Sequence, residues 1–235
     1  MNQQYADAWH TDVVPRVIAL KMCHQVMKNY SYLVVDPGSC QAVIVDPAWQ
    51  MEKIDQALTG TQARLSGILI THAHPDHVHL AKPIADKYDC PIWMSKEEIA
   101  VSGFNARQLI GIDTDPWTVG QMVIEPIFTP GHTPGCICYL IGDSLFTGDV
   151  LFAEGCGICP DIQSAHAMFA SLKTLKSRLK PQTRVFPGHS YGKPPGQELS
   201  QLLRDNIYLH FSDKDSFAAF RLRSGQDKAK LFNFS

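Results

Sequence analysis

The segment 71–77, which reads Thr-His-Ala-His-Pro-Asp-His, sets the strongest limit on how this chain can fold. It follows a short apolar run with the length of a buried strand. In an extended segment His72 and His74 face the same side, whereas Asp76 and His77 follow the bend that the proline allows. Four metal-binding side chains within six residues predict a rigid strand end that presents them together.

Three further clusters have the same design, because each places a metal-capable side chain beside Gly or Pro after an apolar run. These clusters are Pro130-Gly131-His132, Thr147-Gly148-Asp149 and Phe186-Pro187-Gly188-His189. Tight turns at strand ends direct side chains back across the edge of a sheet. We therefore expect the four strand ends to converge on one point.

Imidazole and carboxylate groups are the ligands that suit zinc and similar metals. Any one of these residues could be an ordinary polar side chain, but a His-x-His-x-Asp-His run with three further clusters is rare by chance. Two metals about 3.5–4 Å apart, bridged by a carboxylate, would activate water as hydroxide. The predicted ligands are His72, His74, Asp76, His77, His132, Asp149 and His189.

The spacing of apolar residues predicts a mixed, layered architecture with sheets packed together and helices outside. The predicted helices are 51–58, 78–88, 165–179 and 198–211. The predicted strands are 13–20, 31–35, 42–45, 65–71, 91–94, 122–128, 137–141, 144–146 and 184–186.

The 235 residues, 45% of them hydrophobic, suit a single domain over 1–235, with 195–235 as a C-terminal helical extension. A net charge of −2 gives no signature of nucleic-acid or membrane-surface binding. The N-terminus lacks the pattern of a signal peptide, and no apolar run is long enough to span a membrane. Seven irregularly spaced cysteines do not form a disulfide framework. These features predict a cytoplasmic protein.

Motif by motif, the chain resembles the metallo-β-lactamase superfamily. The resemblance implies an α+β fold, an αββα sandwich of two mixed sheets with the site at one edge. It places His72, His74 and His132 on one zinc, Asp76, His77 and His189 on the other, and Asp149 between them. It gives Asp46, in Val45-Asp46-Pro47, a supporting role behind the ligands. Iron or manganese in place of zinc stays open.

Within the superfamily, residues 148–157 and 187–191 resemble the glyoxalase II branch, which mainly hydrolyses thioesters. Residues 157–161 lack the Lys and Tyr with which that branch holds glutathione, and the C-terminal part is short. Residues 148–161 are similar to the zinc-dependent hydrolases of bacterial polyketide biosynthesis clusters. This similarity implies an acyl thioester on an acyl carrier protein, removed as a proofreading step. Three residues are predicted to line the substrate pocket: Cys159, Tyr191 and His210.

The predicted reaction is attack of hydroxide on a thioester carbonyl, with Asp76 as ligand and as the residue that orients the nucleophile. A thiol with a pKa near about 8.5 leaves without a strong general acid. An acidic carrier protein would dock on basic residues, for which Lys173, Lys176 and Lys180 at helical spacing are candidates, with Arg178 and Arg184 nearby. A plain solvated helix face is the competing interpretation.

Other functions stay open: a hydrolase of acylglutathione, a mononuclear-iron persulfide dioxygenase, a lactonase, or a binding protein with a vestigial site. The complete set of seven ligands argues against the last. His79 is interpreted as a residue near the site and not as an eighth ligand. Cys156 and Cys159 form a Cys-x-x-Cys pair, for which packing is favoured over a metal or redox role. The oligomeric state is not predicted.

Overall fold

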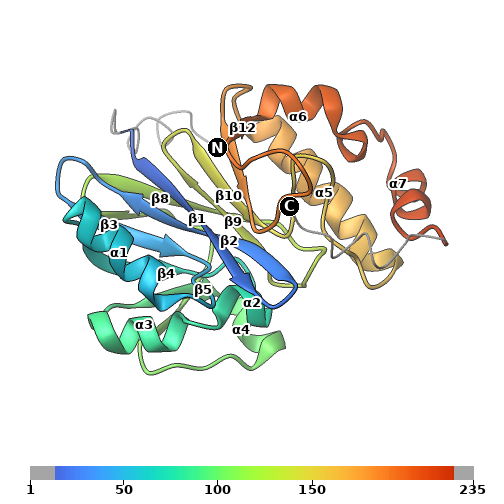
Figure 1. The fold of residues 1–235 in the computed structure, drawn as a ribbon. Coiled ribbons are helices and arrows are strands. Elements are labelled where there is room, and N and C mark those ends of the chain that lie inside the picture. Colours follow the sequence, from blue (N-terminus) through green and yellow to red (C-terminus); the bar gives the residue numbers. More distant parts are fainter. Residues whose placement is uncertain (1–13, 225–235) are drawn as a thin grey trace.

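The computed structural model describes residues 14–224, which form two six-stranded sheets packed face to face, with helices on both outer faces (Figure 1). The predicted α+β class and αββα sandwich are therefore confirmed. None of the helices in this described range has the length and hydrophobicity that crossing a membrane requires.

The first sheet has the strand order of the sequence: β1 (Arg16–His24), β2 (Met27–Val35), β3 (Gln41–Val45), β4 (Arg64–Leu69), β5 (Ile92–Ser95) and β6 (Leu109–Ile112). β1, β2 and β3 pair antiparallel, and β3 to β6 pair parallel. The parallel part needs crossover connections. These contain α1 (Met51–Thr61), then α2 (Pro75–Val78) and α3 (Ala81–Tyr88), then α4 (Lys96–Ser102).

The second sheet has the order β12 (Gln197–Glu198), β11 (Arg184–Pro187), β10 (Ser144–Gly148), β9 (Ile137–Ile141), β8 (Met122–Phe128) and β7 (Trp117–Val119). Only β10 and β11 pair parallel. The long helix α5 (Ile162–Arg178) connects them, and it begins where the side chain of Asp161 accepts a hydrogen bond from the Ser164 amide, 2.7 Å away.

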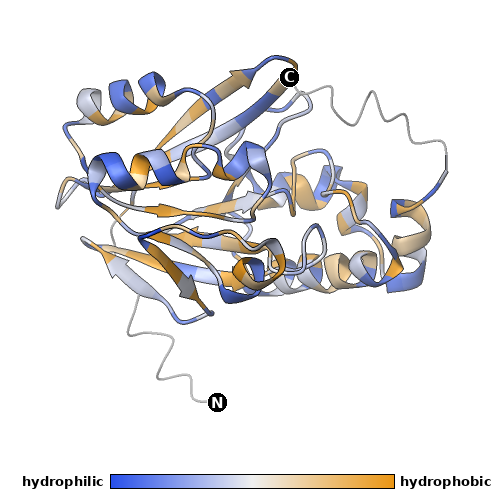
Figure 2. Cartoon of the chain, turned by 90° about the horizontal axis from the view of Figure 1, so that it is seen from below, coloured by the Kyte–Doolittle hydropathy of each residue, from blue (hydrophilic) through white to orange (hydrophobic). Residues whose placement is uncertain are grey.

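The core consists of three layers of apolar side chains. Residues such as Tyr32, Tyr139 and Phe146 fill the space between the two sheets. The first sheet packs on its outer face against α1 and α3, and the second packs against α5 and the C-terminal helices. Figure 2 shows largely hydrophobic strands inside and hydrophilic stretches on the outer helices. Burial of both faces of each sheet makes the strand ends rigid, and the candidate ligands follow these ends.

The predicted helix 78–88 is wrong in its extent, because the structure has two helices there. α2 starts at Pro75, inside the His-rich segment, and α3 starts at Ala81. The amide of Leu80 donates to the carbonyl of Pro47, 3.0 Å away, and this bond turns the chain between them. Pro83 lies in the first turn of α3, where a missing amide hydrogen costs least.

The predicted helix 198–211 is also wrong, because α6 (Leu199–Asp205) ends before Asn206 and a short 3₁₀ helix (Ile207–Leu209) follows. The side chain of Asn206 accepts a hydrogen bond from the amide of Tyr208 and donates to the carbonyls of Phe152 and Gly155, all at 3.0 Å. Asn206 therefore stops the helix and fastens the loop that follows Asp149.

Several elements were not predicted, namely α4, α7 (Lys214–Arg221), β6, β7 and β12, and β1 and β2 are longer than expected at the hairpin between them. The described part of the predicted C-terminal extension packs on α5. Phe217 of α7 is completely buried, with its ring 5.7 Å from that of Phe169. Residues 225–235 of that extension lie outside the described range.

Candidate metal centre

All seven predicted ligands follow the carboxyl ends of strands and lie together at one edge of the sandwich. His72 and His74 follow β4, and Asp76 and His77 lie in α2 directly beyond. The other three follow three strands of the second sheet: His132 follows β8, Asp149 follows β10 and His189 follows β11. The two sheets are connected at this edge by a hydrogen bond of 3.0 Å from the amide of Ile137 to the carbonyl of Thr71.

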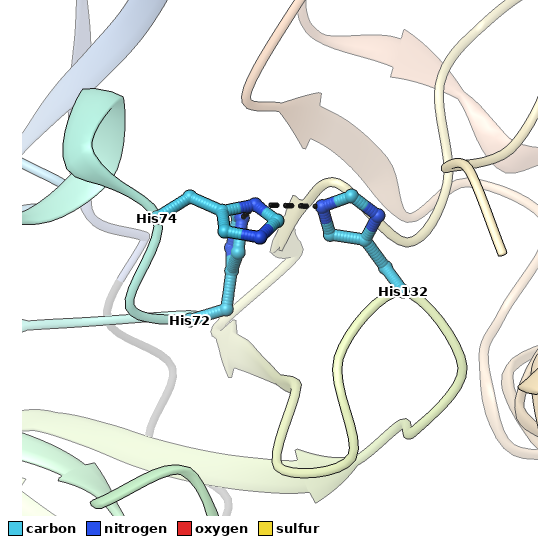
Figure 3. A group of neighbouring side chains, drawn as sticks. All are labelled: His72, His74 and His132. Atoms are coloured by element: carbon cyan, nitrogen blue, oxygen red, sulfur yellow. Dashed lines mark hydrogen bonds between the residues drawn. The ribbon is translucent and has the colours of Figure 1, made fainter. Parts of the chain in front are cut away.

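One group of donors consists of His72, His74 and His132, whose rings point toward one another (Figure 3). His74 Nδ1 lies 3.0 Å from His72 Nε2 and 3.0 Å from His132 Nε2. All three donor atoms lie within 4.8 Å of one another. This spacing suits three ligands of one metal ion.

A second group consists of Asp76, His77 and His189, which also lie within 4.8 Å of one another. His189 Nε2 is 3.1 Å from Asp76 Oδ2, and His77 Nε2 is 3.7 Å from the same oxygen.

Asp149 lies between the two groups and reaches both with its carboxylate. Its Oδ2 is 3.6 Å from His132 Nε2 in the first group and 3.6 Å from His189 Nε2 in the second. Its Oδ1 is 3.4 Å from His77 Nε2. This is the position that a bridging carboxylate needs.

Hydrogen bonds behind the histidines determine which ring nitrogen faces the site. Nδ1 of His132 lies 2.9 Å from the carbonyl of Ile158, and Nδ1 of His189 lies 2.7 Å from the carbonyl of Lys28. Carbonyl oxygens only accept, so both Nδ1 atoms carry the proton. In the neutral rings both Nε2 atoms therefore present lone pairs to the site.

The same argument holds for His77 and His72 through the carboxylate of Asp46, which is 2% exposed. His77 Nδ1 donates to Asp46 Oδ2 at 2.8 Å. The hydroxyl of Thr71 donates to this oxygen at 2.6 Å, so Thr71 Oγ1 accepts from Nδ1 of His72, 3.1 Å away. Asp46 also accepts from the Thr71 amide at 2.8 Å. The Asp46 carboxylate thus lies behind His77 and, through Thr71, behind His72.

The donor set fits a cation better than it fits hydrogen bonding alone. Nε2 of His72 and of His132 both need a donor, but His74 Nδ1 supplies at most one proton to the pair. Among the described residues, the buried atoms His77 Nε2 and Asp149 Oδ1 also have no hydrogen-bond partner. Buried lone pairs without a partner are costly, and a metal ion would satisfy them together.

Glu98 is a supporting residue that the sequence analysis missed. It is 2% exposed, and its Oε1 accepts from the amide of Ala73 at 2.8 Å while its Oε2 accepts from the hydroxyl of Thr133 at 2.5 Å. It therefore ties together the two loops that carry His72, His74 and His132. The Ser95-x-x-Glu98 spacing is a capping-box signal, and it could have located the start of α4.

Arg221 of α7 is a second supporting residue that was missed. Its side chain is buried, and its Nε donates to the carbonyl of Gly157, 2.7 Å away. Gly157 itself has no room for a side chain, because a Cβ would lie 1.8 Å from the carbonyl oxygen of Asp149. The C-terminal helix thus holds the loop that follows Asp149, and no local pattern signals such a contact.

The two donor groups differ in their affinity for protons. Burial lowers the pKa of His72 well below its usual value, and the neighbouring His77 and His132 lower it further. Burial also lowers the pKa of His77, but Asp149 and Asp46 outweigh this effect and raise it well above the usual value. The pKa of His189 is raised as well. Burial lowers it, but Asp149 and Asp76 outweigh burial.

Zinc binding to the metal-free chain is expected to release protons at neutral pH. His77 and His189 have raised pKa values, so they hold protons that a metal must displace, whereas His72 is already neutral. Apparent zinc affinity should therefore increase as the pH rises from about 6 to about 8. Calorimetric titrations in buffers of different ionisation enthalpy measure this release. Heats that are identical in all buffers would contradict it.

A cavity of about 770 Å³ opens over the donors. His74, Asp76, His132, Asp149 and His189 lie at its base, and apolar and aromatic side chains form most of its wall. The wall residues come from the β1–β2 hairpin, the loop after Asp149 and the C-terminal helices, and include Met27, Phe152, Ile158, Ile207, Tyr208 and Phe220. Such a cavity accepts a substrate with a largely apolar chain.

The three predicted pocket residues have different positions. Tyr191 lines the cavity and packs edge-on against Phe152, with ring centroids 5.4 Å apart. Cys159 is buried in the core around α5, and Cys156 lines the cavity in its place. His210 is not part of the cavity wall, and its Nε2 lies 2.9 Å from the carbonyl of Leu203.

Cys156 and Cys159 are both buried, and burial raises the pKa of each thiol, to about 11 for Cys159. Neutral thiols are poor metal ligands and poor nucleophiles, so a packing role suits this pair. His79 is not part of either donor group, and its ring packs at a tilt against Trp49, with ring centroids 4.7 Å apart.

A two-sheet sandwich with His and Asp donors at its shared edge defines a class of metal-binding proteins in which loops after the strands build the site. Residues 25–189 match the family model of the metallo-β-lactamase superfamily. The chain belongs to this superfamily.

Two relatives with similar lengths come from Bacillus. The chain is 44% identical to the probable polyketide biosynthesis zinc-dependent hydrolase BaeB of Bacillus velezensis, over 92% of this chain and 96% of the relative. It is 41% identical to the probable polyketide biosynthesis zinc-dependent hydrolase PksB of Bacillus subtilis, over 90% and 95%.

Among solved structures, the crystal structure of ETHE1 from Myxococcus xanthus is similar to this chain. It superposes with a TM-score of 0.75 at 28% identity, and the match covers 92% of this chain and 95% of that protein. The similarity thus extends beyond residues 25–189 into the C-terminal part.

Proposed function

We propose that this chain is a zinc-dependent hydrolase that removes acyl groups from the thioester arm of an acyl carrier protein, as a proofreading step in polyketide biosynthesis. The observation that carries this proposal is the pair of donor groups joined by Asp149 at the base of a largely apolar cavity. The relatives named as probable zinc-dependent hydrolases of polyketide biosynthesis support the zinc dependence, the hydrolytic reaction and the biosynthetic context.

The proposed centre holds two zinc ions, one on His72, His74 and His132 and one on Asp76, His77 and His189, with Asp149 shared between them. Zinc in such a site lowers the pKa of water to near neutrality and polarises a carbonyl oxygen. The chain's own residues orient the substrate and accept the proton of the attacking water.

Asp76 is the residue that we assign to the attacking water. Its carboxylate lines the cavity. Burial raises its pKa, but the hydrogen bond from His189 and the charges of His77 and His189 together outweigh burial and lower the pKa. It is therefore ionised at neutral pH and able to accept a proton from the nucleophile. The leaving thiol needs no strong acid, since its pKa is near about 8.5. The apolar wall formed by Phe152, Tyr208 and Phe220 excludes water from the acyl chain.

A substrate panel tests this function. We expect zinc-loaded protein to hydrolyse an acetylated carrier protein with a higher kcat/KM than acetyl-CoA, S-acylglutathione or a lactone. Chelation should abolish the activity, since the chemistry depends on the metal. Preference for the lactone or for acylglutathione would contradict the proposal. Oxygen consumption by a protein with one iron would instead identify a persulfide dioxygenase.

Charge-reversal variants, assayed with the same substrates, test where the carrier protein docks. Lys173 and Lys180 of the predicted basic face are exposed, whereas Arg178 is paired with Glu125 and Arg184 with Asp143. Lys176 donates to the carbonyl of Leu209, 2.6 Å away. We therefore assign docking to Lys173 and Lys180.

Lys173→Glu should raise KM for the carrier-bound substrate about threefold, the size of an exposed charge contact, and leave a small thioester unchanged. Arg64→Glu, at an exposed position at the amino end of β4 and so on the edge opposite the donors, is the matched control. Equal effects of the two reversals would remove Lys173 from the docking surface.

A further inference from the structure

The side chain of Asn29 connects the second donor group to Trp49, which lies just before helix α1. Asn29 is completely buried in β2. Its Nδ2 donates to the backbone carbonyl of Asp76 at 2.7 Å, and its Oδ1 accepts from Nε1 of Trp49 at 2.7 Å. The amide therefore has a fixed orientation, because the indole nitrogen only donates and the carbonyl only accepts.

Trp49 is held in an unusual backbone conformation to make this contact. Its φ angle is 61°, in the left-handed region that side chains other than glycine rarely adopt. Its indole packs against two imidazole rings, stacked on that of His24 at 4.6 Å and tilted against that of His79 at 4.7 Å between centroids. His79 directly follows α2, the helix that carries Asp76. A strained residue with a fully engaged side chain at a site edge indicates a functional constraint.

The strand β2 also holds His189, another ligand of this group. The carbonyl of Lys28 accepts from His189 Nδ1 at 2.7 Å, and the amide of Tyr30 donates to the carbonyl of Gly188 at 2.8 Å. Three successive residues of one strand thus fix Asp76 and His189. The first group is held differently, through Thr71, Glu98 and the carbonyl of Ile158.

We propose that Asn29 and Trp49 are positioning residues for one half of the metal centre only, and that they set the affinity of the zinc held by Asp76, His77 and His189. The proposal rests on the two-zinc assignment made above. It predicts that the two zinc ions respond differently to a change at Trp49, which a general loss of packing would not produce.

The test is Trp49→Phe, which keeps one aromatic ring beside His24 and His79 and removes the N–H that fixes Asn29 together with the second ring of the indole. We expect the protein to bind its first zinc equivalent normally and its second about 10- to 100-fold more weakly, the range for residues behind metal ligands. Competition with a chromophoric chelator measures both steps. Excess zinc should restore kcat, which would not happen if the fold itself were damaged.

Asn29→Ser serves as a second variant, because it also breaks the connection without touching the stacked rings, and the same loss is expected. Trp117→Phe is the matched control, since Trp117 packs against Trp93 and Tyr139 away from the donors. If wild-type protein binds two equivalents and Trp49→Phe binds both unchanged, or weakens both equally, the positioning role is overturned. Wild-type protein that binds a single equivalent overturns the two-zinc assignment as well.

Discussion

The Asp149→Asn variant is expected to lose more than about a hundredfold in kcat/KM together with at least part of its zinc, a loss above the range for residues that only support ligands. Asp149 is the side chain within reach of both donor groups, at 3.6 Å from His132 and 3.6 Å from His189. An amide places a neutral group, and on one side an N–H, where two cations need a shared negative charge.

Metal analysis and kinetics of purified Asp149→Asn measure these losses. Asp143→Asn is the matched control, because Asp143 precedes the same strand and pairs with Arg184 on the surface. The proton-binding properties of the site provide a second readout. His189 and His77 lower the pKa of Asp149 against the effect of burial, and Asp149 in turn raises theirs. The variant should therefore release fewer protons when zinc binds. Unchanged zinc content and activity would exclude a bridging role.

The positions of the ligands could be predicted because each motif is local. A donor beside Gly or Pro after an apolar run needs only its own turn to reach the edge of a sheet. Because the sheets are rigid, their packing alone then brings His72, Asp149 and His189 together. The same reasoning gave the layered fold, since periodic apolar runs report which faces are buried.

The supporting residues could not be predicted in this way, because their partners are distant in the sequence. Asn29 meets Asp76, and Arg221 meets Gly157, only after the sheets and the C-terminal helices have packed. The helix predicted through Asn206 failed for the same reason, since a tertiary contact of this side chain ends the helix. Whether a residue such as His210 lines the cavity depends on loop conformation, which apolar periodicity does not report.

The Asp46→Asn variant is expected to lose activity on the order of 10³-fold while remaining folded, because it reverses the tautomers of two ligands. The amide of Thr71, 2.8 Å away, needs an oxygen as its acceptor, so the oxygen of the introduced asparagine must lie on that side. The NH₂ group then takes the place of the oxygen that faces Thr71 Oγ1 and His77 Nδ1. His77 Nδ1 must then accept a hydrogen bond, so its Nε2 carries the proton and has no lone pair for a metal.

The effect extends to the other donor group through the hydroxyl of Thr71. When this hydroxyl accepts from the introduced NH₂ group, its own proton turns to Nδ1 of His72, 3.1 Å away, and His72 Nε2 is protonated as well. The opposite orientation of the asparagine amide is unfavourable, because its NH₂ group would then face the amide hydrogen of Thr71, and two donors would meet. One substitution without change of shape therefore disables one ligand of each zinc.

Zinc affinity, kcat/KM and thermal stability together distinguish this mechanism from a loss of packing. Asp36→Asn is the control, because Asp36 is also completely buried and accepts from Gly38, Ser39 and Gln121, but it lies away from the donors. Both variants should lower the melting temperature, since each replaces hydrogen bonds to a buried charged carboxylate with weaker ones to a neutral amide. Only Asp46→Asn should lower zinc affinity. If Asp36→Asn lowers zinc affinity equally, the loss comes from general destabilisation, and the tautomers of His72 and His77 do not depend on Asp46.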